Sequence, residues 1–180
     1  MQNWVVIDEN YLNYLRNAEY RIPYSNYGDD KYKPFFGVLF EKGDLFYVTQ
    51  ISHPKPRHSH MKNSPDFIKI YAPNRGPEKA DELIAVVNLN YMFPVHKSLI
   101  KKLEYRDIEQ HRTFSSQQEK SKYIDLLTKE LALINQLGVD EKAKRLYERK
   151  VSFPADQVSL RCLDFCYLEK LAEKYVSPSE

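Results

Sequence analysis

The chain has 180 residues, an apolar fraction of 42% and a net charge of only +2. This length predicts a single domain over residues 1–180, with enough apolar side chains for a core. No apolar run approaches the ~20 residues of a membrane span, and the N-terminus lacks a basic segment followed by an apolar one. We therefore expect a cytoplasmic protein without membrane contacts, in which any attraction for nucleic acid comes from local clusters of cations.

The first third of the chain predicts a strand, a helix and a hairpin. Trp4–Ile7 is apolar enough for a short strand, and Asp8 is placed to cap a helix whose apolar face holds Tyr11, Leu12 and Leu15. A tyrosine-rich loop spans residues 20–33. Two β-rich runs, 35–41 and 45–51, flank a glycine-containing turn and indicate a hairpin. Its pairing would place residues 33–36 opposite about residues 50–53.

The middle of the chain predicts more strands. Residues 66–71 alternate between apolar and polar side chains, and residues 83–89 form a nearly continuous apolar run, which is typical of a strand buried on both faces. The connection over residues 72–81 is rich in turn residues. We expect residues 92–95 to end the second strand at Pro94, and residues 103–108 to add an edge strand.

From Ser115 the pattern changes to helix. Ser116 and Glu119 fit a capping box, apolar residues then recur at helical spacing, and Gly138 is a natural stop. Asp140 is placed to cap a second helix, and residues 160–175 predict a third. Cys162 and Cys166 would lie on one face of that helix, a spacing that suits neither a zinc knuckle nor a disulfide. The whole predicts an α+β fold, with an antiparallel sheet from residues 1–110 and helices from residues 111–180 packed on it.

A cationic loop, Ile51–Lys62, follows the second hairpin strand and is the candidate functional site. Its two prolines exclude a helix or a central strand. It contains two serines and no acidic residue. Its histidines and strong cations are His53, Lys55, Arg57, His58, His60 and Lys62.

These residue types suit the cleavage of RNA, whose 2′-hydroxyl is a built-in nucleophile, so that no metal is required. Histidine, with an ordinary pKa of ~6.5, suits the two proton transfers. Lysine can stabilise the transition-state charge, and the loss of such a donor costs about 2.7–4 kcal/mol in known oxyanion sites. Ser52, His53 and Lys55 supply these groups, and the hairpin would bring Lys33 to the same place. The products would be a 2′,3′-cyclic phosphate and a 5′-hydroxyl end.

Other interpretations fit the loop less well. A basic, proline-rich loop is often only solvated. His58-x-His60 could bind a metal, but no carboxylate lies nearer than Asp66, so we expect neither a metal site nor a cofactor. A serine hydrolase would need Ser52 and His53 on one face, whereas neighbours on extended backbone point to opposite faces. A small-phosphoester hydrolase would need a deeper pocket. A non-catalytic protein that binds structured RNA remains the alternative.

Several further residues are candidate RNA contacts. Tyrosines can stack on unpaired bases, each contact contributing about 1–3 kcal/mol, and cations can bind phosphates. The candidates are Tyr11, Tyr27, Arg57, His58, His60 and Lys62.

Taken in order, five motifs resemble those of the endoribonuclease toxins of type III toxin–antitoxin systems, the ToxN/AbiQ family, and are most similar to its CptN-like members. They are Tyr11-x-x-Tyr14-Leu15, Ile22-Pro23, Lys33-x-Phe35-x-Gly37-Val38, Ser52-x-Pro54-Lys55-x-x-His58 and Val87-Asn88-Leu89-x-x-Met92-x-Pro94. The resemblance implies a strongly twisted antiparallel sheet like that of Kid/MazF toxins and metal-independent RNA cleavage. It also implies a role in phage defence or plasmid maintenance.

The same resemblance implies partners and roles. The partners would be cellular RNA and a small repetitive RNA antitoxin folded as a pseudoknot, which the toxin processes and with which it forms a ring-like or 2:2 assembly; DNA is not expected. The family has a hydroxyl pair before Pro-Lys. The first hydroxyl corresponds to Ser52, the lysine to Lys55 and the upstream lysine to Lys33. This chain departs from the pattern at the second hydroxyl, where it has His53, a better acid–base group.

Overall fold

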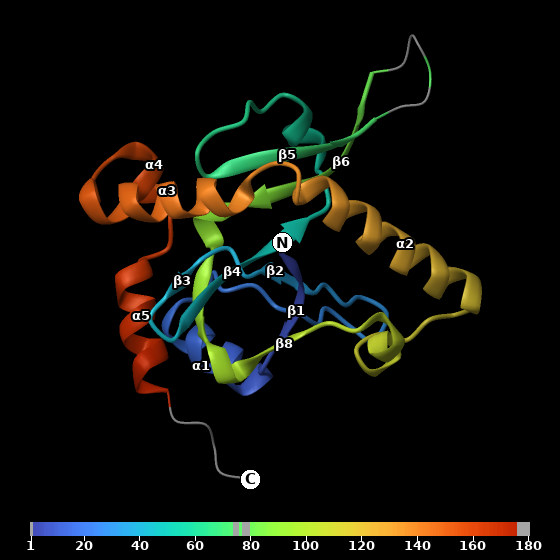
Figure 1. The fold of residues 1–180 in the computed structure, drawn as a ribbon, viewed down its shortest axis with the longest axis horizontal. Coiled ribbons are helices and arrows are strands. Elements are labelled where there is room, and N and C mark those ends of the chain that lie inside the picture. The colour runs from blue at the N-terminus through green and yellow to red at the C-terminus, as the bar shows by residue number, and fades with distance from the viewer. Residues whose placement is uncertain (1, 74–75, 77–79, 176–180) are drawn as a thin grey trace.

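The computed structural model describes residues 2–73, 76 and 80–175. An antiparallel sheet lies at its centre, with the strand order β5-β6-β4-β2-β1-β8 and with β3 and β7 also paired to β4 (Figure 1). This arrangement confirms the predicted α+β fold with an antiparallel sheet. The strands are β1 (Asn3–Ile7), β2 (Phe35–Gly37), β3 (Glu41–Lys42), β4 (Leu45–Ser52), β5 (Phe67–Ala72), β6 (Glu82–Asn88), β7 (Phe93–His96) and β8 (Ile100–Lys102).

β4 is the central strand, and most of its side chains are buried. The hairpin that leads into it is confirmed: Lys42 pairs with Leu45 across the turn, and Phe35 pairs with Gln50. Gly43 in the turn has φ +59°, a conformation that glycine adopts without a steric penalty. β2 and β6 flank β4 on opposite sides. β4 therefore crosses the core and delivers its C-terminal end to the segment that holds Ser52.

Two strand predictions need correction. Pro94 does not simply end a strand, because residues 93–96 form β7, which pairs with β4. Among the described strands β7 pairs with β4 alone, and an edge strand tolerates a residue without an N–H donor. The expected edge strand at residues 103–108 is instead β8 at residues 100–102, followed by a 3₁₀ turn over residues 105–110. The three-residue spacing of Tyr105 and Ile108 aligns their side chains on one face of that turn.

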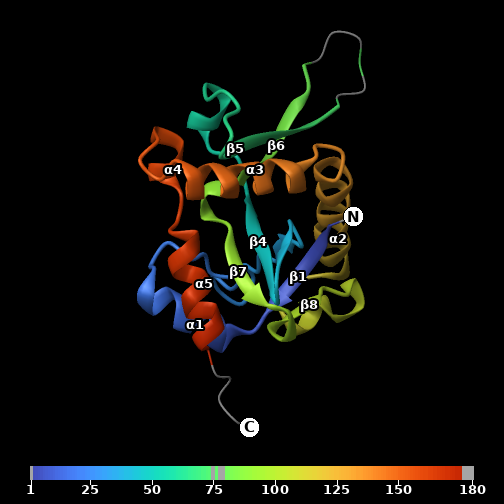
Figure 2. The same cartoon turned by 60° about the vertical axis from the view of Figure 1, so that its left-hand side comes forward.

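In the described part of the chain, five α-helices surround the sheet: α1 (Glu9–Ala18), α2 (Gln117–Ile134), α3 (Val139–Ser152), α4 (Gln157–Arg161) and α5 (Phe165–Lys174). α2 and α5 lie on opposite sides of the central strands (Figure 2). Asp8 caps α1 as predicted, and its carboxylate accepts a hydrogen bond from the Tyr11 amide at 2.9 Å. Gly138, with φ +57°, ends the turn after α2 and is itself the N-cap of α3, in place of the expected Asp140.

The start of α2 is capped nearly as predicted. The Ser116 hydroxyl accepts from the Glu119 amide at 3.1 Å. The Glu119 carboxylate, however, accepts from the amide of Ser115 rather than from that of Ser116. The second hydrogen bond of the capping box is therefore shifted by one residue toward the N-terminus.

The predicted helix over residues 160–175 is confirmed only from residue 165 onward, as α5, because the chain breaks between α4 and α5. The Leu163 amide donates to the Asn90 carbonyl at 2.9 Å, which draws it out of the helical ladder. Asp164 then caps a new helix by accepting from the Tyr167 amide at 3.0 Å. Cys162 is consequently buried and Cys166 exposed, and both thiols are free.

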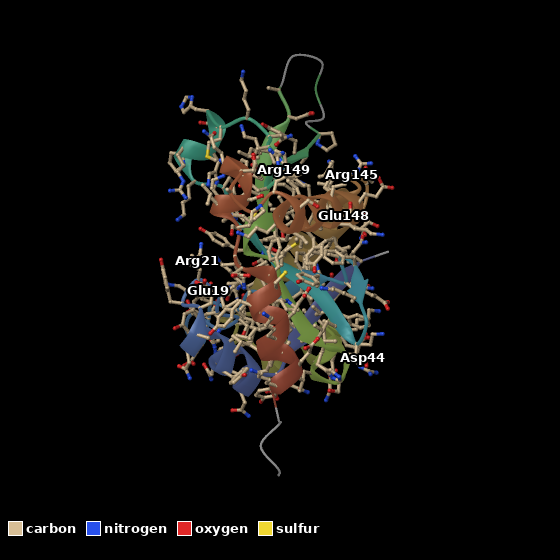
Figure 3. The ribbon with its side chains drawn as sticks, turned by 90° about the vertical axis from the view of Figure 1, so that its left-hand side faces the viewer. Glu19, Arg21, Asp44, Arg145, Glu148 and Arg149 are labelled. Atoms are coloured by element: carbon tan, nitrogen blue, oxygen red, sulfur yellow. The ribbon has the colours of Figure 1, made fainter. Side chains whose placement is uncertain are left out.

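Side-chain ion pairs tie the C-terminal helices together. Arg149 on α3, labelled in Figure 3, donates two hydrogen bonds to Asp156, the N-cap of α4, at 2.7 and 2.8 Å. Arg161 at the end of α4 donates two to the buried carboxylate of Asp66, both at 2.8 Å. Buried apolar side chains between Trp4 and Ala172 in the sequence form one hydrophobic core. Among the described residues, no helix has both the length and the apolar character needed to cross a membrane.

Replacement of Arg161 by Gln should expose the dependence of this arrangement on one ion pair. Burial by itself raises the pKa of Asp66, but the hydrogen bonds from Arg161 and Ser64 outweigh it and the pKa is lowered. The carboxylate therefore adds stability above its unfolded pKa of about 3.9, and this contribution is lost as the pH falls through the folded pKa. We expect Arg161→Gln to lower the free energy of unfolding by about 2 kcal/mol at pH 7 and by less below pH 4. Urea titrations at both pH values measure this; an equal loss at both would contradict it.

Candidate functional site

A cavity of about 550 Å³ opens beside the end of β4. Its lining includes three segments that carry candidate functional groups. The tyrosine-rich loop contributes Tyr27 and Lys33, the end of β4 and the residue after it contribute Ser52 and His53, and α2 contributes Glu130. We call it the Ser52 cavity. It brings together three of the four predicted catalytic residues, Lys33, Ser52 and His53.

The strand register explains why Lys33 reaches Ser52. Phe35 pairs with Gln50 and Phe36 with Thr49, so paired residue numbers sum to 85. Continued two residues beyond Phe35, the same register places Lys33 opposite Ser52. The predicted proximity of the upstream lysine to the loop is thus confirmed at the level of the backbone.

Gln50, which the sequence analysis did not select, organises this side of the cavity. Its side-chain amide is buried and donates to the backbone carbonyls of Tyr24 at 2.7 Å and Lys33 at 3.2 Å. Its carbonyl oxygen accepts from the Tyr27 hydroxyl at 3.3 Å. The Lys33 ammonium lies 5.1 Å from the centre of the Tyr27 ring. One amide therefore holds both the loop and the ring that the lysine faces. A glutamine inside an otherwise apolar strand was the available signal.

The cationic loop leaves the cavity as a 3₁₀ turn over Pro56–Ser59. His58 holds this turn from within: its Nδ1 accepts from the Lys55 amide at 3.0 Å, and its ring lies 5.4 Å from that of Phe67. Burial lowers the pKa of His58, and the charges of Arg57 and Lys55 lower it further. The imidazole is therefore neutral at pH 7, and its Nδ1 is engaged by the backbone of the loop.

The remaining loop cations point to solvent. Lys55, Arg57, His60 and Lys62 are all exposed. Lys55 lies two residues after His53 and does not line the Ser52 cavity. We call these four exposed residues the cationic rim. His58 does not belong to the rim, because its buried ring holds the loop in place.

The structure removes Tyr11 from the candidate RNA contacts in this conformation. Its side chain is fully buried, and its hydroxyl donates to the Pro94 carbonyl at 2.6 Å. Tyr27, by contrast, is 46% exposed and lines the cavity. The position of Tyr11 on the apolar face of α1 was the signal for burial.

α2 forms the far wall of the cavity and is anchored to β1. The Trp4 indole donates to the Leu127 carbonyl at 2.8 Å, and Asn135 exchanges hydrogen bonds with the backbone of Gln2. This wall contains Glu130, a 7% exposed carboxyl group that the sequence analysis did not select. Among the described residues, no group of three or more His, Cys, Asp or Glu side chains is arranged to hold a metal ion.

Comparison with known proteins identifies the family. A family model described as the toxin ToxN of a type III toxin–antitoxin system matches residues 3–173. The chain belongs to the ToxN family. This membership covers nearly the whole chain and confirms the resemblance inferred from the five sequence motifs. A search of curated proteins gave no match.

Solved structures share the ToxN fold with this chain at 19% identity. One comes from a bacterial antiviral system regulated by a processed non-coding RNA, with a TM-score of 0.72 over 96% of this chain and 98% of that one. Another concerns type III toxin inhibition by a non-coding RNA pseudoknot, with a TM-score of 0.69 over 97% of both chains. A third is AbiQ, a lactococcal anti-phage endoribonuclease of a type III system, with a TM-score of 0.70 over 96% of both.

The burial of Tyr11 leads to a prediction about stability. Tyr11→Phe leaves the Pro94 carbonyl without its donor, and we expect the free energy of unfolding to fall by about 1–2 kcal/mol. Tyr20→Phe is the matched control, because the Tyr20 side chain is 84% exposed and should tolerate the change. Thermal denaturation of both variants measures the difference. Equal melting temperatures would show that the buried hydroxyl contributes nothing.

Proposed function

We propose that this ToxN-family toxin is a metal-independent, sequence-preferring endoribonuclease that leaves 2′,3′-cyclic phosphate and 5′-hydroxyl ends. The observation that carries the proposal is the meeting of Lys33, Ser52 and His53 at one cavity, beside an exposed cationic rim. The endoribonuclease activity of AbiQ, which has the same fold, supports it.

The reaction needs a base, an acid and a stabiliser of charge. The 2′-oxygen attacks the adjacent phosphorus, the bond from phosphorus to the 5′-oxygen breaks, and the proton lost by the 2′-hydroxyl is balanced by one gained at the 5′-oxygen. His53 serves as the acid or the base of these transfers. Lys33 and Lys55 stabilise the charge on the phosphate oxygens, and Ser52 positions the phosphate or relays a proton.

The surroundings of the cavity suit a single RNA strand. Tyr27 offers an exposed ring for stacking on a base. Arg57, His60 and Lys62 contact phosphates along the strand, while His58 keeps the loop in shape. The RNA partners of this toxin are cellular transcripts and a repetitive pseudoknot RNA antitoxin, which it processes and by which it is inhibited in a ring-like or 2:2 assembly. The pseudoknot inhibition of a protein with the same fold supports this part of the proposal.

Substitution at the cavity tests the chemistry. We expect His53→Ala to slow cleavage by about 10²–10⁴-fold, because a proton-transfer group is lost. Lys33→Ala and Lys55→Ala should each slow it by about 10²–10³-fold through loss of charge stabilisation. Cleavage is followed in EDTA with single-turnover kinetics, and the 5′ ends are characterised. Lys101→Ala, an exposed lysine on β8, is the control.

Full EDTA-resistant cleavage by the Ser52→Ala, His53→Ala and Lys55→Ala variants would contradict the site. Tight binding of RNA by the wild-type toxin without any 5′-hydroxyl fragment would instead favour a non-catalytic RNA-binding protein.

The cationic rim leads to a separate prediction about salt. Each lysine or arginine that neutralises a phosphate contributes close to one unit to the slope of log affinity against log salt concentration. We expect Arg57→Ala and Lys62→Ala each to reduce this slope by about 0.7 for single-stranded RNA, while cleavage of bound RNA stays nearly unchanged. Binding isotherms at four salt concentrations measure it; unchanged slopes would place the RNA elsewhere.

A further inference from the structure

Glu130 is an unusual residue in this fold because most of its side chain is buried, yet it lines the Ser52 cavity and pairs with no other described side chain. Its side chain lies on α2 and is 7% exposed, and among the described residues it makes no hydrogen bond or ion pair. The other buried acids are paired: Asp66 with Arg161 and Glu169 with Lys42. A buried polar group that lacks a partner costs stability, so its presence calls for an explanation.

Other described charged side chains line the cavity, but none of them forms a hydrogen bond or ion pair with Glu130. Arg112 donates to Glu119 at 2.9 Å, and its guanidinium lies 4.4 Å from the centre of the Tyr123 ring. Lys33 faces Tyr27. The other titratable groups that line the cavity are Asp30 and Lys31 from the tyrosine-rich loop, Tyr32, His53 beyond β4, and Tyr123 on α2, which interacts electrostatically with Glu130. The carboxyl group thus remains available to a ligand.

The rest of the cavity suits a flat, largely apolar ring. Trp4, Tyr32, Leu126 and Leu127 line it, and its volume of about 550 Å³ falls in the usual range for small-molecule sites. Ser52 and His53 stand at the same cavity. A ring bound between these walls would lie next to the phosphate that these residues contact.

We propose that the Ser52 cavity binds one unstacked nucleobase of the RNA, and that Glu130 recognises the hydrogen-bonding edge of that base. The proposal rests on the proposed function and adds a specificity-determining residue to it. An ionised carboxylate has two acceptor oxygens side by side, which match the adjacent N1–H and N2–H donors of guanine. Adenine, cytosine and uracil each place an acceptor beside their donor, so one carboxylate oxygen would face another acceptor. Guanine is therefore the expected base.

The protonation state of Glu130 makes this preference depend on pH. Burial raises the pKa of the carboxyl group to about 7. Below that pH the protonated group offers one donor and one acceptor, which any of the four bases can match, and the preference weakens. Above it the carboxylate is selective. Guanine binding, which supplies two donors to the charged form, lowers the pKa again and so favours the selective state at neutral pH.

Cleavage of a randomised RNA library tests the proposal. Wild-type toxin, Glu130→Gln and Glu130→Leu are compared at pH 6 and pH 8, and the 5′-hydroxyl ends are sequenced. Because each preference is a ratio of rates at one pH, changes in His53 ionisation cancel. We expect the wild type to favour guanine at one position next to the cut by on the order of 10-fold at pH 8 and by less at pH 6. Gln, which keeps one donor and one acceptor, should lose the preference at both pH values, as should Leu.

Two outcomes of that experiment would overturn the proposal. One is an unchanged base preference at every position in Glu130→Gln. The other is an equal fall in rate for all four bases, which would make Glu130 a proton-transfer group. Misfolding is checked by the melting temperature. Because the pKa of Glu130 is raised in the folded state, its contribution to stability falls as the pH rises from the unfolded pKa of about 4.3 to about 7 and is fully lost above that, so Glu130→Gln should be at least as stable as the wild type at pH 8.

A second measurement does not depend on cleavage. Trp4 is the only tryptophan of the chain and lines the cavity, so its fluorescence reports on a base that enters. We expect guanosine monophosphate to quench it at lower concentration than the other three nucleotides. Inosine monophosphate, which lacks the 2-amino group, should bind about 10-fold more weakly, and Glu130→Gln should abolish the difference.

The two experiments separate the two proposals. Glu130-dependent guanine binding without RNA cleavage would retain the base site and reject the endoribonuclease. Cleavage with no effect of Glu130 on base choice or on nucleotide binding would retain the endoribonuclease and reject the base site.

Discussion

The pairing of Phe35 with Gln50 is the interaction on which the arrangement of the site depends. It sets the register between β2 and β4 and so carries Lys33 to Ser52 from a position 19 residues earlier in the chain. A slip of one residue would turn every side chain of β4 to the other face of the sheet. The buried Gln50 amide strengthens the same junction, because its three hydrogen bonds involve Tyr24, Tyr27 and Lys33. The chemistry of the cavity is therefore placed by a strand that is itself part of the core.

The polar groups of the molecule divide into those that hold the fold and those left open at the cavity. Asp66, Asp156 and Glu169 are paired with Arg161, Arg149 and Lys42, and the His58 imidazole is neutral and bonded to the loop backbone. Glu130 is buried without such a partner, and Ser52, His53 and Lys33 line the same cavity. A folded chain gains stability by pairing its buried polar groups, so the unpaired Glu130 at this cavity supports the proposed base site.

The two walls of the cavity come from segments far apart in the sequence. The N-terminal hairpin supplies the side that carries Lys33 and Ser52, and α2 supplies the other, anchored through the bond from Trp4 to Leu127. This division explains why the family pattern, concentrated in the first hundred residues, contains the proposed chemistry but not Glu130. It also separates the two proposed tasks: cleavage lies on the sheet, and base recognition on the helix that covers it.

Periodicity and turn chemistry by themselves determined the sheet-forming and helix-forming halves, the hairpin, the caps at Asp8 and Ser116, and the segment in which the site lies. These features depend on neighbours in sequence, which a pattern records. Tertiary contacts decided the rest. Asn90 breaks the last helix by accepting from Leu163, the α1 core buries Tyr11, and Phe67 and the Lys55 amide take up His58. Each of these outcomes depends on a partner from another part of the chain or on packing that no local pattern encodes. For the same reason, the positions of Gln50 and Glu130 at the cavity follow from the packing of the sheet against α2 and not from a local pattern.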